Sequence, residues 1–154
     1  MLKRIFTLSL IVLLLISALP FGAYATDYTG TNEECIYFED GSYIRITITE
    51  SVTRASGTKT GTKKYDYTGS DGEVKWEATL RGTFTYTGTS SVCTSSSCDV
   101  TIYESAFYVV SKTASTSGNS AIATLTMGRK VLGITVAKNT YNMSLSCDIN
   151  GNLS

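Results

Sequence analysis

The segment 73–87 alternates without a break between mainly apolar side chains and polar or charged side chains over 15 residues. A helix repeats every 3.6 residues and a strand every two, so the segment predicts a strand with one face toward a core. A glycine on that face, Gly82, predicts a bend or a close approach of another backbone. The inward set is mainly apolar and comprises Val74, Trp76, Ala78, Leu80, Gly82, Phe84 and Tyr86.

The rest of the chain has the same β character. After Ala25 it contains 23 threonines and 9 tyrosines, and branched and aromatic side chains favour strands. Short polar links separate the strand-like segments, so we expect an all-β fold, an antiparallel sandwich or a small closed barrel of about eight strands. The further predicted strands are 36–38, 43–52, 63–68, 100–110, 121–127, 131–137 and 141–147.

The first hairpin is predicted from its turn residues. Asp-Gly suits a tight turn because the required positive φ angles are inexpensive for these residues. A two-residue turn at Asp40 and Gly41 would place Cys35 opposite Ile46 and point the cysteine into the core.

The register of the second hairpin is predicted from charge. A four-residue loop would pair Asp66 with Lys75, whereas a two-residue loop would place Asp66 opposite Glu77. Opposite charges across a ladder help by about a few tenths of a kcal/mol, so the four-residue loop is preferred. Both registers place Tyr67 on the same face as Trp76.

The N-terminus has the three-part pattern of a secretory signal peptide. Lys3 and Arg4 precede an apolar run over 5–19, and Ala23 and Ala25 supply the small residues read by a signal peptidase. The run of 15 residues is shorter than the roughly 20 that span a bilayer. We therefore expect a signal peptide over 1–25, cleavage after Ala25, and a single secreted β domain over 26–154 without a transmembrane segment.

The four cysteines predict two disulfides in an exported chain. Cys93 and Cys98 are separated by four residues, and a loop of that length between two strands would bring them together. Cys35 would then pair with Cys147 and join the first strand to the last. Four cysteines allow three connectivities, and this one is preferred over a zinc site or a redox-active pair.

Several segments resemble those of small uncharacterised secreted proteins of clostridia-like gut bacteria. The resemblance is carried by 76–86, the Cys93-x4-Cys98 pair, 100–111 and the ending 147–154, and it covers roughly residues 60–154. These proteins have no established activity. The resemblance implies a bacterial exported protein and transfers no functional residue.

Charge and residue types exclude several classes of function. The formal charge is zero and there is no histidine, which argues against nucleic-acid binding and against histidine-dependent catalysis or metal sites. No cofactor is expected. Glu77 and Glu104 are candidate carboxylates for a hydrolase, and Glu104 shares the apolar face of its predicted strand. An N-terminal acidic cluster lacks the spacing of a calcium loop and predicts a solvated patch; it comprises Glu33, Glu34, Glu39 and Asp40.

Tyrosines off the main apolar faces are the best candidates for binding, since exposed rings can stack on sugars. They are Tyr28, Tyr43, Tyr103 and Tyr141. We therefore expect a non-catalytic module that binds a surface glycan or an envelope polymer. One alternative is an antimicrobial or membrane-acting β protein, because the alternation over 81–87 also suits a strand in a bilayer. The other alternative is a carboxylate-dependent hydrolase.

Overall fold

The computed structural model describes residues 31–51 and 57–154, so the predicted signal peptide and Tyr28 lie outside the described part. In the described part, no helix is long and apolar enough to cross a membrane. The strands are β1 (Thr31–Tyr37), β2 (Tyr43–Ser51), β3 (Thr58–Thr68), β4 (Val74–Tyr86), β5 (Ser91–Ile102), β6 (Phe107–Ser117), β7 (Ser120–Val131) and β8 (Ile134–Ser146).

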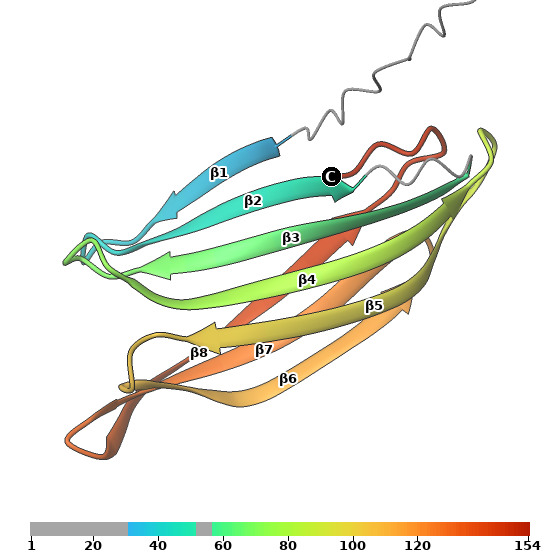
Figure 1. The fold of residues 1–154 in the computed structure, drawn as a ribbon. Coiled ribbons are helices and arrows are strands. Elements are labelled where there is room, and N and C mark those ends of the chain that lie inside the picture. Colours follow the sequence, from blue (N-terminus) through green and yellow to red (C-terminus); the bar gives the residue numbers. More distant parts are fainter. Residues whose placement is uncertain (1–30, 52–56) are drawn as a thin grey trace, which may run out of the picture.

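The strands form two antiparallel sheets in simple chain order. Strands β1 to β5 make a five-stranded sheet, and β6 to β8 make a three-stranded sheet that packs against its inner face (Figure 1). The chain passes from one sheet to the other once, between β5 and β6. The all-β prediction is confirmed as a sandwich-like pair of sheets, and the closed-barrel alternative is wrong.

The core lies between the two sheets and follows the predicted alternation of β4. Trp76, Leu80 and Phe84 are fully buried on its inner face. Gly82 makes room for side chains and not for the predicted backbone, because a Cβ atom there would lie 2.5 Å from the Phe84 ring and 2.9 Å from the Ala121 Cβ. The opposite sheet contributes Ala121, Ala123, Leu125, Met127, Met143, Leu145 and Cys147 to the same core.

The β1–β2 turn differs from the prediction by one residue. Gly41 adopts a φ of 81° and its N–H donates to the Phe38 carbonyl at 3.1 Å, which makes a three-residue loop in place of the two-residue one. Cys35 therefore lies opposite Arg45 and not opposite Ile46. A slip of one residue turns a strand's side chains to the other face, so Cys35 points away from the core.

The predicted register of the second hairpin is also wrong. Asp66 lies opposite Glu77, the arrangement that pairs two like charges. The Lys64 amine bridges them, at 3.2 Å from Asp66 Oδ1 and 3.0 Å from Glu77 Oε2. The expected shared face is confirmed, since Tyr67 stacks on Trp76 with ring centroids 5.5 Å apart.

Neither predicted disulfide forms, and all four cysteines are free thiols. Cys93 and Cys98 lie on one continuous strand, β5, and not on either side of a loop. Five residues of strand span about 16 Å, far beyond the roughly 4.4–6.8 Å between the Cα atoms of a disulfide. The Cys35–Cys147 bond fails because Cys35 faces outward from β1 while Cys147 is buried in the core.

The two buried cysteines of β5 share a face because of an irregularity in the strand. The register between β4 and β5 shifts between Thr83 and Phe84, which leaves Thr94 without a partner. Such a bulge inserts one extra residue and resets the alternation. Cys93 and Cys98 would otherwise point in opposite directions, and with the bulge both enter the core.

We expect one reactive thiol in the native protein. Burial raises the pKa of the thiols of Cys93, Cys98 and Cys147, and buried thiols are also shielded from reagents. Iodoacetamide at pH about 8 should therefore label Cys35 quickly and the other three only after unfolding, as followed by intact mass. The free-thiol assignment would be contradicted if the native, labelled protein gained no further mass when it was unfolded in the same reagent without a reductant.

The last third of the chain departs most from the predicted strands. The predicted strand 100–110 is broken by a turn over 103–106 that separates β5 from β6. The two predicted strands 121–127 and 131–137 are not separated at Gly128 either, because β7 continues to Val131. Strands β7 and β8 thus form one long hairpin that turns at Leu132 and Gly133.

Candidate functional site

Four turns lie at the same end of the sandwich, because each follows an odd-numbered strand of an up-and-down chain. They are the β1–β2, β3–β4, β5–β6 and β7–β8 turns (Figure 1). Two adjoining cavities of about 120 and 170 Å³ lie at this end. Asp40, Tyr67, Phe107 and Arg129 line both cavities, so we treat the two as a single feature, the end cleft.

Aromatic rings from both sheets form the floor of the end cleft. The Tyr67 ring contacts Trp76 on one side and Phe107 on the other, with centroids 5.5 and 5.6 Å away. Trp76 in turn contacts Tyr141 of β8 at 5.1 Å. Burial raises the pKa of the Tyr141 hydroxyl, so this side chain is neutral over the ordinary pH range.

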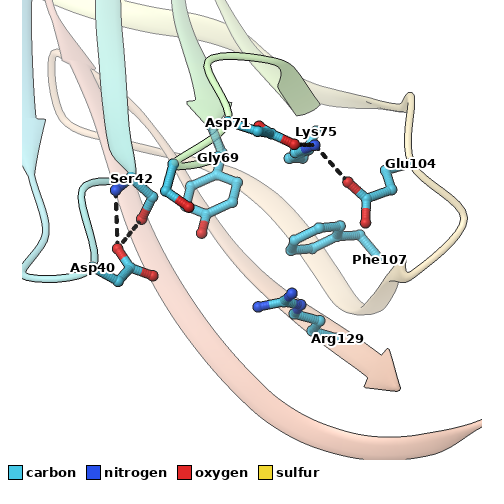
Figure 2. Close-up of a pocket in the computed structure, with 10 residues that line it drawn as sticks. Asp40, Ser42, Gly69, Asp71, Lys75, Glu104, Phe107 and Arg129 are labelled. Atoms are coloured by element: carbon cyan, nitrogen blue, oxygen red, sulfur yellow. Dashed lines mark hydrogen bonds and ion pairs between the residues drawn. The ribbon is translucent and has the colours of Figure 1, made fainter. Parts of the chain in front are cut away.

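One side of the rim is an ion-paired cluster centred on Lys75 (Figure 2). The Lys75 amine contacts the Asp71 carboxylate and lies 2.8 Å from Glu104 Oε2. Lys75 has no partner on β3, because the register shifts between Tyr67 and Thr68. A bulge of this kind redirects a side chain, and here Lys75 meets the turn residue Glu104.

Hydrogen bonding holds the Asp71 carboxylate in its ionised form. Its bond with the Lys75 amine is the main cause that lowers the pKa of Asp71, and the Glu73 N–H also donates to Asp71, at 3.0 Å. The same contacts raise the pKa of Lys75, with Asp71 contributing more than Glu104. Asp71 and Lys75 therefore stay charged throughout the neutral range.

The other side of the rim is formed by Asp40 and Arg129 (Figure 2). The Ser42 hydroxyl and N–H donate to Asp40 Oδ1 at 2.6 and 3.0 Å, and these bonds lower the pKa of Asp40. The positive charge of Arg129 contributes to the same shift. The Arg129 guanidinium lies over the Phe107 ring, 5.7 Å from its centroid.

The end cleft combines an aromatic floor with charged groups of both signs. Its carboxylates can accept hydrogen bonds, and Lys75 and Arg129 can donate them. A general acid needs a carboxyl with a raised pKa, whereas the pKa values of Asp40 and Asp71 are lowered. Among the described residues, no group of three or more acidic or cysteine side chains is arranged to hold a metal ion.

The predicted binding tyrosines do not form one surface. Tyr141 lines the end cleft, while Tyr43 and Tyr103 lie outside it. Tyr43 packs against Tyr37 with centroids 5.5 Å apart. Tyr103 is 59% exposed, and its hydroxyl donates to Glu77 Oε2 at 3.4 Å.

The acidic candidates also separate. Glu104 and Asp40 both reach the end cleft, whereas Glu77 pairs with Lys64 at 3.0 Å outside it. Glu104 belongs to a turn, so its predicted place on an apolar strand face is wrong. Glu33 pairs with Arg45 at 3.0 Å.

Sequence reasoning missed most of the residues that line the end cleft, among them Lys75, Phe107 and Arg129. The charge argument predicts Lys75 opposite Asp66, but Asp66 lies opposite Glu77 and the bulge leaves Lys75 without a partner on β3. Arg129 was assigned to a turn, but it lies on β7 opposite Ala137. Comparison with known proteins finds no matching family, no similar curated protein and no similar solved structure.

Proposed function

We propose that the chain is a non-catalytic binding module that takes a carbohydrate portion of a surface glycan or envelope polymer into the end cleft. The observation that supports this is the aromatic floor beneath a rim of ionised groups. Sugars present apolar C–H faces that pack on rings and hydroxyls that bond to charged groups. Tyr67, Phe107 and Tyr141 would supply the ring surfaces, and Asp40 and Arg129 the polar contacts.

Several features favour binding over hydrolysis. The rim carboxylates are engaged with cations or with Ser42, and those of Asp40 and Asp71 are held ionised. A glycoside hydrolase needs one protonated carboxyl beside one ionised carboxylate. An ionised, hydrogen-bonded rim is better suited to recognition.

The proposal includes export from a bacterial cell, with the mature protein starting at Thr26. Its support is the secretory pattern of residues 1–25. The intact mass of secreted protein is the test. A secreted species that retains residues 1–25 would contradict the proposed cleavage after Ala25.

A glycan array with purified chain starting at Thr26 tests the binding function. We expect Arg129→Gln to weaken binding by about tenfold, because a charged hydrogen-bond donor at the rim is lost. Arg81→Gln is the matched control, since Arg81 is exposed on β4 and outside the cleft. Binding should not depend on chelators.

Two results would contradict this function. If no glycan or envelope polymer binds, the proposed ligand class is wrong. If Arg129→Gln and Arg81→Gln bind alike while Tyr103→Ala loses binding, the site is the exposed face around Tyr103 and not the end cleft.

A further inference from the structure

We propose that the tip of the β7–β8 hairpin docks end-on into an anionic lipid bilayer. This goes beyond the proposed cleft function and does not depend on it. The tip is defined by four apolar residues that the fold leaves in water. They are Val131, Leu132, Ile134 and Val136, which are 48%, 98%, 71% and 56% exposed.

The tip contrasts with the other end of the same hairpin. There, Ala121, Leu125 and Leu145 are completely buried between the sheets. The hairpin continues beyond this packed part, and its turn lies at the lower left in Figure 1. Its apolar end therefore contributes nothing to the core, and its exposure needs another explanation.

The turn places a leucine in a backbone conformation that leucine disfavours. Leu132 has a φ of 50° and Gly133 a φ of 80°, the signs that a two-residue hairpin turn of type I′ requires. Asparagine or aspartate usually precedes the glycine in such a turn, because leucine is strained at positive φ. Leu132 is the one non-glycine residue with positive φ among the described residues.

Charge identifies the surface that the tip would meet. Lys130 directly precedes the apolar tip on β7, and Arg129 and Lys138 lie further from the tip along the hairpin. The Lys130 amine lies 4.6 Å from the centre of the Tyr108 ring, at the base of the tip. The sequence contains no acidic residue between Glu104 and Asp148, so every charged side chain on strands β6 to β8 is positive.

The shape of the tip favours a bilayer over a protein partner. Val131 lies opposite Ile134, Leu132 caps the end, and Val136 occupies an irregularity in the ladder, so apolar groups surround the tip. A narrow tip buries far less than the roughly 800 Å² per partner of a stable protein interface. A bilayer can surround it on all sides, while the lysines contact anionic headgroups.

Docking in this way would also orient the end cleft. The second of its cavities is lined by Met127, Gly128 and Arg129 from β7 and by Ala137 and Asn139 from β8, at the base of the hairpin. Insertion of the tip would therefore hold the end cleft next to the membrane surface.

Co-sedimentation with lipid vesicles tests the proposal, using the chain that begins at Thr26 and keeps every described residue. We expect binding to vesicles of phosphatidylcholine with a quarter phosphatidylglycerol, and much weaker binding to pure phosphatidylcholine. Leu132→Asn should lower the partition coefficient by about tenfold or more, because a leucine side chain no longer enters the lipid. This variant creates the preferred Asn-Gly turn, so it should fold at least as well as the parent.

Further variants separate charge from apolar contact. Lys130→Gln with Lys138→Gln should lower partitioning into anionic vesicles by about fivefold for each cation. Val92→Thr is the matched control, since Val92 is 50% exposed but lies on β5 near the opposite end of the sandwich. It should bind like the parent.

Three outcomes would overturn the proposal. The first is no binding to anionic vesicles, and the second is equal partitioning of the Leu132→Asn and Val92→Thr variants. The third is a dimer in sedimentation equilibrium that Leu132→Asn dissolves, which would make the tip a contact between two copies of this chain.

Discussion

Trp76→Ala should destabilise the domain by about 3–5 kcal/mol, the usual cost of deleting a fully buried aromatic side chain. Trp76 is 1% exposed and contacts the rings of both Tyr67 and Tyr141. The change would leave a cavity between the two sheets and remove the centre of the cleft floor. Urea unfolding followed by far-ultraviolet circular dichroism measures the loss. Tryptophan fluorescence cannot be used for the variant, because Trp76 is the single tryptophan.

Tyr103→Ala is the matched control for this change. Tyr103 is 59% exposed and its hydroxyl makes one long, exposed hydrogen bond to Glu77, so we expect Tyr103→Ala to cost no more than about 0.5 kcal/mol. A loss below about 1 kcal/mol for Trp76→Ala would show that the tryptophan is not packed between the sheets.

Lys64→Met should destabilise the domain by about 1–2 kcal/mol at neutral pH, after allowance for solvent screening at a side chain that is 39% exposed. The Lys64 amine is the cation between Asp66 and Glu77, which lie directly opposite each other on β3 and β4. Methionine keeps the length and apolar stem of lysine. The change therefore leaves two carboxylates facing each other without a bridging charge.

The loss from Lys64→Met should depend on pH with a definite sign. Burial already raises the pKa of Asp66, and the Lys64 amine opposes that shift. Without Lys64, the pKa of Asp66 in the folded protein should rise further above its unfolded value of about 3.9. A raised carboxyl pKa costs stability above that pKa, and the cost disappears as pH falls through it. The deficit should thus be largest at pH about 7 and smaller at pH about 4.

A second substitution isolates the like-charge repulsion. Glu77→Gln in the Lys64→Met background should recover part of the lost stability at pH about 7, as measured by a double-mutant cycle in urea. A deficit that is the same at both pH values, or no recovery with Glu77→Gln, would mean that Lys64 acts through packing alone.

The period of a strand could be read directly from the sequence, because alternation is a local property of the chain. The segment 73–87 predicted β4 and the inner face that runs from Trp76 to Phe84, and the structure confirms both. At Gly82 the close neighbours are side chains and not the predicted backbone. The composition predicted an all-β fold, and the turn residues identified the first two hairpins.

The registers required the tertiary structure, because the competing turns differ by little free energy. One extra residue in the β1–β2 loop moved Cys35 from the inner face to the outer face. Pair energies of about a few tenths of a kcal/mol could not decide the second hairpin, where Lys64 forms ion pairs with both Asp66 and Glu77. The predicted Cys35–Cys147 bond failed for the same reason, whereas the predicted Cys93–Cys98 bond failed because both cysteines lie on β5.

The sequence by itself determined that this chain builds two-faced strands around an apolar core, since residue spacing fixes which side chains share a face. Only the tertiary structure brought together Asp40, Lys75, Glu104 and Arg129, which come from separate turns and strands. The residues next to each of them in the sequence give no indication that the four side chains lie together. Their meeting depends on the sheet change between β5 and β6 and on the bulge at Lys75, which are set by packing of the whole chain.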